Sequence, residues 1–313
     1  MDTRELISGF FGGELRETMK KVQWEAMKTV TEIRVRPDKP VIVKTLSGEC
    51  FISSGGSPCS AEFGYKPSKK DMRVTLEMLG SYSLYAFQEE IKNGYITIPG
   101  GHRVGISGQC VAEEGKVKTV KNISALCYRI NHQIIGCGDI AYDFINGQSL
   151  RHTLIISPPG GGKTTLLRDI VRKLSCGGYT VGVCDERSEI AGSYMGAAQN
   201  DVGIRTDVLD GCPKAIGMAM LLRSMSPEVI AADEIGKRED LAAIEDVINA
   251  GIKLICTVHG ASIEDILKKP VLSEILNKNI FERFVLLEKK IKPGVIKAIY
   301  DNEYKDIYNN RGR

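Results

Sequence analysis

From about residue 150 to the end of the chain, short apolar runs typical of buried strands alternate with segments that have apolar residues at helical spacing. The first such helix carries Leu166, Leu167, Ile170, Val171 and Leu174 on one face. Strands are predicted at 152–157, 180–186, 228–234, 253–260, 283–290 and 294–301, and helices at 164–174, 213–225, 237–251 and 261–281, the last broken near Pro270. This alternation predicts a doubly wound α/β domain, in which ligands bind at the carboxyl ends of the strands.

The first half of the chain has a different, mixed pattern. Residues 5–22 have an apolar helical face, weakened by Gly12-Gly13, which we expect to pack in a core or against another subunit. A hairpin is predicted at 31–51, a loop at 53–70, one or two helices at 71–94, two strands around a Pro-Gly-Gly turn at 95–111, and a last strand pair at 116–130. We therefore expect an α+β domain over residues 1–138, followed by the α/β domain over residues 139–313.

Composition narrows the class of protein. A chain of 313 residues suggests two domains, and no apolar run approaches the roughly 18 residues of a membrane helix. The charged, mixed N-terminus does not resemble a signal peptide, and the nine scattered cysteines read as reduced thiols of a cytosolic protein. The four histidines show no zinc spacing, and a net charge of +3 is too small to indicate nucleic-acid binding by itself.

A phosphate-binding loop follows the strand at 152–157. The sequence ISPPGGGKTTLLRD has the spacing of a P-loop, except that Ser157 stands where the pattern has its first glycine. Glycines bring backbone N–H groups close to a ligand, and the following helix adds its N-terminal dipole. We expect Lys163 to bind the β- and γ-phosphates and Thr164 to bind Mg²⁺. The predicted nucleotide-binding residues are Pro159, Gly160, Gly161, Gly162, Lys163, Thr164 and Thr165.

Two acidic residues end the predicted strand EVIAADE. Asp233 is suited to the Mg²⁺ shell, as the strand-borne aspartate is in P-loop NTPases. Glu234 is then placed to orient and deprotonate an attacking water. This pair favours a hydrolase over a kinase, which needs an acceptor site instead.

Two further clusters stand at strand ends. In CTVHG, Thr257 and His259 end a strand, and a sensing role near the γ-phosphate is expected for His259. In CDERSEIAG, the acidic residues are Asp185, Glu186 and Glu189. They either help to position water or metal or cap the N-terminus of a following helix.

These motifs carry a resemblance. LLRSMSPEVIAADEIGKRED together with AGIKLICTVHG resembles the core of type II and type IV secretion and pilus ATPases, and CDERSEIAG falls at their aspartate box. Gly236 stands where that family often has an arginine after Glu-Ile. Over nearly its full length the chain is more similar to the stage III sporulation AA family of endospore-forming bacteria. The resemblance implies a RecA-like ATPase that uses ATP and Mg²⁺, forms a homo-oligomeric ring such as a hexamer, and acts in the mother-cell cytoplasm.

The resemblance also implies roles for partners and for the first domain. The expected partners are membrane channel proteins of the sporulation apparatus, through which all membrane contact would occur. In secretion ATPases the N-terminal domain supplies arginines to a nucleotide site. Arg103 and Arg129 are the catalytic candidates here, from a set that also includes Arg34 and Arg36.

Other functions stay open at this point. A RecA-type nucleic-acid motor would need aromatic and basic pore loops, and no aromatic-basic cluster appears; stimulation of the ATPase by single-stranded DNA would favour it. A small-molecule kinase would release ADP only with an acceptor present. A nucleotide-gated scaffold would bind ATP with little turnover.

Overall fold

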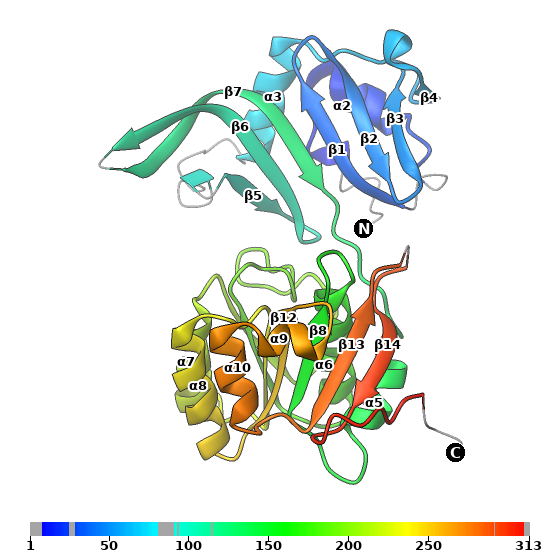
Figure 1. Ribbon diagram of the computed structural model, residues 1–313. Coiled ribbons are helices and arrows are strands. Elements are labelled where there is room, and N and C mark those ends of the chain that lie inside the picture. The colour runs from blue at the N-terminus through cyan, green and yellow to red at the C-terminus, as the bar shows by residue number, and fades with distance from the viewer. Residues whose placement is uncertain are drawn as a thin grey trace. The chain divides into compact units, whose positions relative to one another are not determined.

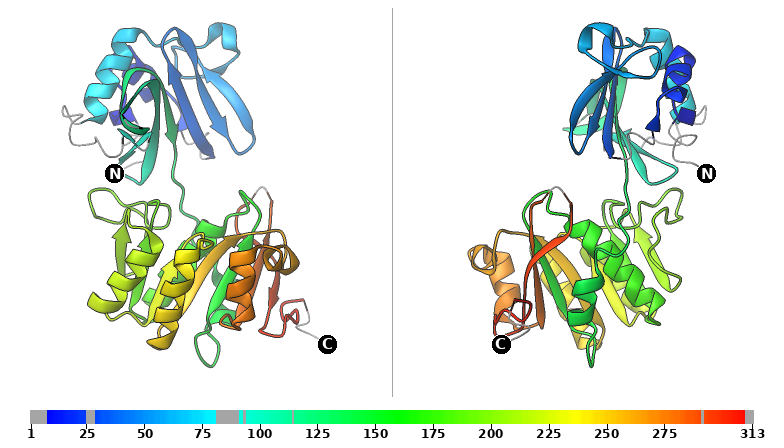
Figure 2. Two further views of the ribbon diagram at one scale, coloured as in Figure 1. Left: turned by 60° about the vertical axis from the view of Figure 1, so that its left-hand side comes forward. Right: turned by 90° about the vertical axis from the view of Figure 1, so that its right-hand side faces the viewer.

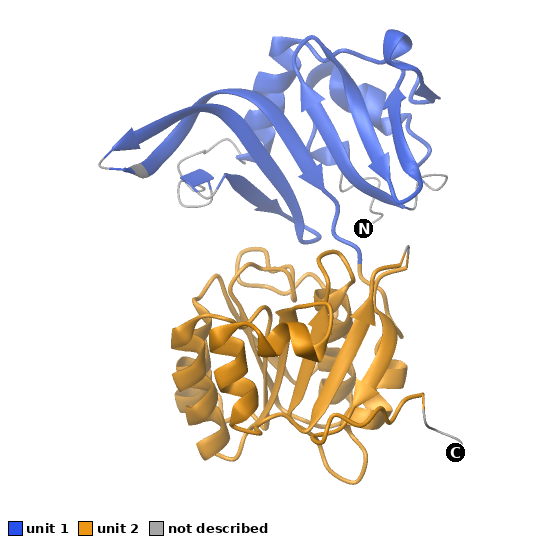
Figure 3. Ribbon diagram, viewed as in Figure 1, with its two compact units in different colours: residues 1–132 blue, residues 133–313 orange. Residues whose placement is uncertain are grey.

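The computed structural model describes residues 8–24, 29–80, 91–92, 94–113, 115–290 and 292–309. The chain divides into two compact units, Met1–His132 and Gln133–Arg313 (Figure 3). The division expected from the sequence, after residue 138, stays a prediction about independently folding domains. The first unit has one sheet and one hydrophobic core, and the second has one sheet with a hydrophobic core on each face.

The first unit is built on an antiparallel sheet with strand order β4-β3-β2-β1-β7-β6-β5 (Figure 1). The strands are β1 (Val30–Arg36), β2 (Lys39–Thr45), β3 (Gly48–Ile52), β4 (Pro58–Cys59), β5 (Tyr95–Ile98), β6 (His102–Glu113) and β7 (Lys116–Arg129). The predicted hairpin at 31–51 is confirmed as β1 and β2, with β3 pairing next to β2. The predicted strand pair at 116–130 is wrong, because β7 is one long strand that pairs with β6 and β1.

Two helices, α2 (Gly13–Lys20) and α3 (Lys69–Leu79), cover one face of this sheet. The predicted helix at 5–22 is interrupted in the structure: Ser8 and Gly9 are helical, residues 10–12 are not, and α2 begins at Gly13, whose φ is +62°. A side chain at Gly12 would meet the backbone of Thr75 at 2.7 Å, so the glycine pair allows α2 to approach α3. Residues 5–7, and residues 81–90 of the predicted helical segment 71–94, lie outside the described residues.

The second unit contains a mostly parallel sheet with strand order β10-β9-β11-β12-β8-β13-β14. The strands are β8 (Thr153–Ser157), β9 (Val181–Asp185), β10 (Thr206–Asp210), β11 (Val229–Ala232), β12 (Lys253–His259), β13 (Arg283–Glu288) and β14 (Val295–Tyr300). β14 pairs antiparallel with β13, and the other pairs are parallel. β10 was not predicted, whereas the other six were.

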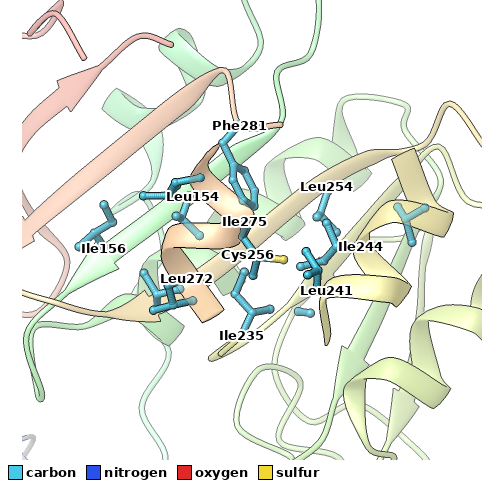
Figure 4. Packing of buried hydrophobic residues seen from close by; sticks show 14 of the residues in the cluster. Leu154, Ile156, Ile235, Leu241, Ile244, Leu254, Cys256, Leu272, Ile275 and Phe281 are labelled. Atoms are coloured by element: carbon cyan, nitrogen blue, oxygen red, sulfur yellow. The ribbon is translucent and has the colours of Figure 1, made fainter. Parts of the chain in front are cut away.

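Helices cover both faces of this sheet (Figures 1 and 2). α5 (Asp139–Ile145) and α6 (Lys163–Cys176) lie on one face, and α7 (Lys214–Ser224), α8 (Arg238–Asn249), α9 (Ile263–Leu267) and α10 (Pro270–Asn277) lie on the other. The predicted break near Pro270 is confirmed, since α9 ends and α10 begins there. Figure 4 shows the core on the α8–α10 side, where Leu154 and Ile156 of β8 pack with Cys256, Leu272 and Ile275.

The strand order decides which residues meet. β12 lies between β8 and β11, and β11 also pairs with β9. The carboxyl ends of these parallel strands share one edge of the sheet, where doubly wound folds bind ligands. Ser157, Asp185, Asp233 and His259 end or directly follow these strands. Among the described helices, none is long and apolar enough to cross a membrane.

Candidate nucleotide site

The loop 158–162 joins β8 to α6 and has the backbone that a phosphate loop requires. Gly160 and Gly162 have φ of +76° and +93°, a region that favours glycine. Ser157 is the buried last residue of β8, and its hydroxyl donates to the carbonyl oxygen of Pro158 at 2.9 Å. Because Ser157 lies in the strand and not in the left-handed region, the missing first glycine of the motif causes no strain.

The turn between β13 and β14 lies directly against this loop. The backbone N–H of Gly294 donates to the carbonyl oxygen of Gly161 at 2.9 Å. A Cβ atom at Gly162 would lie 2.3 Å from the nitrogen of Gly294 and 2.6 Å from Cβ of Pro293. Position 162 therefore requires glycine for two reasons: its φ is positive, and the turn between β13 and β14 leaves no room for a side chain.

Two P-loop side chains contact Asp233, which directly follows β11. Nζ of Lys163 lies 3.2 Å from Oδ1 of Asp233, and Lys163 is buried. The hydroxyl of Thr164 donates to Oδ2 of Asp233 at 2.5 Å. Pro159 lies in the loop and Thr165 in the first turn of α6, and their contact with a nucleotide stays a prediction.

Thr257 of β12 forms hydrogen bonds with both Asp233 and Glu234. Its buried hydroxyl donates to Oδ1 of Asp233 and accepts from the backbone N–H of Glu234 at 2.9 Å. Its carbonyl oxygen accepts from the N–H of Ile235 at 2.9 Å. The hydroxyl thus fixes the aspartate side chain and the glutamate backbone at once, and Glu234 is held with a φ of +57°. Such a conformation costs on the order of 1–3 kcal/mol in a non-glycine residue.

Three cationic or titratable side chains surround the carboxylate of Glu234. Nη1 of Arg187 lies 2.9 Å from its Oε2, and Nε2 of His259 lies 3.3 Å from its Oε1. Nζ of Lys163 lies 3.9 Å from Oε2. The structure therefore brings Lys163, Thr164, Asp233, Glu234 and His259 together; the catalytic and binding roles given to them by the sequence stay predictions.

Asp185 points into its own loop. Its buried carboxylate accepts from the backbone N–H groups of Glu189, Ile190 and Ala191 at 2.8 to 3.0 Å. Burial raises the pKa of Asp185 to about 6. The side chain therefore organises the turn after β9. No helix lies between β9 and β10 among the described residues, so the helix-cap interpretation is wrong. The catalytic roles of Asp185 and Glu186, in positioning water or metal, stay predictions.

Glu186 is paired with two lysines, Lys214 at the start of α7 and Lys237 before α8. Burial acts to raise the pKa of Glu186, but the hydrogen bonds from both lysines outweigh it, so the pKa lies below its usual value. A cavity of about 10 Å³, close to the space that one water requires, lies beside these groups. Its lining residues are Asp185, Glu186, Arg187, Glu189, Lys214, Asp233 and Glu234.

The site suits Mg²⁺ by the chemistry of its donors. Thr164 and Asp233 offer a hydroxyl and a carboxylate oxygen within hydrogen-bond distance of each other, and Mg²⁺ prefers such oxygen ligands, with few from the protein and the rest from phosphates and water. Lys163 stands next to them as the charge that would meet the phosphates.

The four arginines proposed from the sequence lie on one face of the first unit's sheet. Ile33 and Val35 of β1 are buried, so the alternating Arg34 and Arg36 lie on the opposite face. The cross-strand register places Arg34 opposite Cys127, and Arg129 directly opposite Arg103 of β6. Arg34 forms an ion pair with Glu32, and Arg103 stacks over the ring of Tyr95 at 4.8 Å. A hollow of about 330 Å³ on this face is lined by Arg34, Arg36, Gly94, Gly105, Ile106, Ser107, Ala125, Leu126 and Cys127.

Sequence reasoning missed several residues of the site. The sequence places Arg187 in the aspartate-box segment without indicating its contact with Glu234, and it indicates no role for Lys214, Lys237 or the Pro293-Gly294 turn. Arg187 has a local signal, because it follows two acids at a strand end. No local sequence pattern indicates the contact of Lys214 with Glu186 or that of Gly294 with Gly161, because each contact joins segments far apart in the chain.

Comparison with known proteins decides the family. A profile described as "Sporulation stage III, protein AA" matches residues 1–307. The chain belongs to this family. Its similarity to stage III sporulation protein AA of Bacillus subtilis (strain 168) is 37% identity over 294 residues, covering 92% of each chain.

Solved structures show the fold. The ATPase DotB of Legionella pneumophila aligns with a TM-score of 0.56 at 15% identity, covering 87% of this chain and 74% of DotB. The pilus retraction motor PilT, solved with bound ADP, aligns with a TM-score of 0.52 at 14% identity, covering 84% of this chain and 75% of PilT. The predicted fold class, an α/β domain preceded by a smaller α+β domain, is confirmed, and the chain shares its fold with these two ATPases.

Proposed function

We propose that this chain is a Mg²⁺-dependent ATPase that works as a homo-oligomeric ring, expected to be a hexamer, and energises a membrane-spanning channel or secretion complex during sporulation. The observation that carries the proposal is the convergence of Lys163, Thr164 and Asp233 at the carboxyl edge of the sheet, next to Glu234. The shared fold with DotB and PilT supports it.

The residues of the site would have distinct roles in binding and hydrolysing ATP. The N–H groups of Gly160, Gly162 and the first turn of α6 would donate hydrogen bonds to the phosphate oxygens. Pro158 and Pro159 have no N–H, and the N–H of Gly161 donates to the carbonyl oxygen of Pro158. Lys163 would leave Asp233 for the β- and γ-phosphates, and Thr164 and Asp233 would hold Mg²⁺. When bound, the ion neutralises charge that develops on the transferred phosphoryl group. Glu234 would take a proton from the attacking water.

The sheet face of the first unit that carries the four arginines supports the proposal that an arginine of one subunit acts on the nucleotide of another. Two arginines directly opposite each other in a sheet repel, so Arg103 and Arg129 favour an anion between or above them. The terminal phosphate of ATP in a neighbouring subunit is the anion that we propose. The backbone of a nucleic acid would suit the same face, so ATPase rates with and without single-stranded DNA separate this ring from a nucleic-acid motor.

The test of the function uses the variant Lys163→Ala. Loss of a charge-assisted contact of roughly 1.5–3 kcal/mol lowers ATP affinity about 10- to 100-fold. Equilibrium binding and phosphate release would be measured with Mg²⁺, together with native mass with and without ATP. Lys305→Ala, which removes an exposed lysine, is the control and should behave as wild type. Normal affinity and turnover in Lys163→Ala would refute the nucleotide site.

Activity at the membrane is proposed to require partners. The expected location is the mother-cell cytoplasm, with peripheral attachment at the membrane through channel proteins. Fractionation of sporulating cells with and without those membrane proteins tests this: the chain should leave the membrane fraction when they are absent.

A further inference from the structure

Arg187 and Glu234 form an ion pair that joins two strand ends of the second unit. Arg187 lies in the turn after β9, and Glu234 follows β11, 47 positions later. Nη1 of Arg187 donates to Oε2 of Glu234 at 2.9 Å. The residue proposed to activate water is thus held by a cation from the turn that follows the neighbouring strand β9.

The backbone that carries Arg187 is fixed, while its side chain is not enclosed. Asp185 accepts three backbone N–H groups from the residues just after the turn, and buried Arg168 donates to the carbonyl oxygens of Glu189 and Ile190. Ser188 has a φ of +51°, which further defines the turn. The Arg187 side chain is 65% exposed. A long side chain on a fixed Cα can therefore change partner without any movement of the fold.

Neighbouring acids leave Arg187 available. Glu186, the next residue, is already paired with Lys214 and Lys237. The backbone N–H of Glu189 donates to Asp185 at 2.8 Å. Arg187 and Glu234 also line the same small cavity as Asp233, the proposed Mg²⁺ ligand. Nζ of Lys163, the proposed phosphate-binding group, lies 3.9 Å from the same Glu234 oxygen that Arg187 contacts.

We propose that Arg187 is a switch between Glu234 and the terminal phosphate of ATP. Without a nucleoside triphosphate, Arg187 holds the carboxylate of Glu234. When ATP binds, the guanidinium moves to the γ-phosphate and frees Glu234 to accept a proton. This inference rests on the proposed ATPase function and assigns a further residue to that site.

Charge and geometry favour the exchange. The terminal phosphate carries more negative charge than a carboxylate, and an arginine can bind it with two parallel hydrogen bonds. Lys163, now 3.9 Å from Glu234, would move to the same phosphates, so two cations would leave the glutamate together. Without these two partners, the carboxylate oxygens of Glu234 would be open to the attacking water. ADP lacks the γ-phosphate and would leave the Arg187–Glu234 pair intact.

The test compares ATP and ADP in Arg187→Ala, Arg187→Lys and the control Arg223→Ala, which changes an exposed arginine on α7. Equilibrium affinities would be measured by titration with a slowly hydrolysed ATP analogue and with ADP, and kcat by phosphate release. In Arg187→Ala, ADP affinity should match wild type, the preference for the triphosphate should fall about 10- to 100-fold, and kcat should fall by a similar factor. Arg187→Lys should recover part of both.

The outcomes separate this inference from the proposed function. If wild type hydrolyses ATP and Arg187→Ala keeps both the triphosphate preference and kcat, the switch is refuted while the ATPase stands. A raised kcat in Arg187→Ala would also refute it, since Arg187 would then only restrain Glu234. If wild type neither binds nor hydrolyses ATP, both proposals fall.

Discussion

The hydroxyl of Thr164 donates to Oδ2 of Asp233 at 2.5 Å, although 69 positions separate these residues in the chain. The contact joins the first turn of α6 to the end of β11 across the carboxyl edge of the sheet. A hydroxyl and a carboxylate oxygen this close form two of the ligands that a Mg²⁺ site needs.

Thr164→Ala should remove the dependence of nucleotide affinity on Mg²⁺. Wild type is expected to bind ATP more tightly with Mg²⁺ than with a chelator, because the ion links the phosphates to Thr164 and Asp233. The variant should bind ATP about equally in both conditions. Titrations with and without EDTA measure this, with Ser224→Ala on α7 as the control. If Mg²⁺ increased the ATP affinity of Thr164→Ala as much as that of wild type, the assignment of Thr164 as a Mg²⁺ ligand would be contradicted.

Glu234→Gln should separate binding from chemistry. The amide keeps the shape of the side chain but cannot take a proton, and loss of a general base costs about 10²–10⁴-fold in rate. ATP affinity should stay within about a few fold, because the phosphates are bound by other groups. Glu239→Gln, in the first turn of α8, is the matched control. Lost binding with normal residual turnover would indicate a structural role for Glu234.

Arg103→Ala should keep ATP binding and lose most hydrolysis, about 10-fold or more, if Arg103 reaches the γ-phosphate of another subunit. Mixing this variant with Lys163→Ala should restore part of the activity, because some interfaces combine an intact loop with an intact arginine. Arg73→Ala, which changes an exposed arginine of α3, is the control. Arg129→Ala is the next variant to test. No recovery, in rings shown to exchange subunits, excludes action across subunits.

Glu282 should link stability to pH. It accepts from Arg151, Lys253 and the backbone N–H of His152. Burial acts to raise its pKa, but these partners outweigh burial and lower the pKa from 4.5 to about 2. The stabilisation is therefore complete above pH 4.5 and is lost as the pH falls through about 2.

Denaturant unfolding of wild type and Glu282→Gln tests this linkage. At pH 7 the variant should be less stable by on the order of 1 kcal/mol, and the difference should shrink below pH 4.5 and be lost as the pH falls through about 2. Glu303→Gln, an exposed acid, serves as the control. A difference that does not change with pH would show that charge is not its source.

The part of the site that sequence predicts is the part with a local signal. The spacing from Gly160 to Thr164 and the apolar run before Asp233 each lie within one segment, and parallel strands bring their ends together. The Arg187–Glu234 pair and the contact of Gly294 with Gly161 depend on which loops meet in space, and no spacing in the chain encodes them.

The errors in the predicted strands have similar physical causes. β10 is a half-buried edge strand with aspartates at two of its positions, so it shows no apolar run. β7 was divided because its middle is polar and exposed, around Lys121 and Asn122, where Asn122 has a φ of +46° and the register with β6 shifts. Pairing with the equally long β6 keeps it one strand.

The turn at Pro293 and Gly294, which supports the P-loop from behind, belongs to the last hairpin of the chain. The loop that would bind phosphate therefore packs against a segment that follows α6, β11 and β12 in the chain. A nascent chain that ends after β12 would contain the P-loop, Asp233 and His259 but not the backbone that contacts Gly161 and Gly162. The loop would then reach its final packing only when the β13–β14 hairpin has been made.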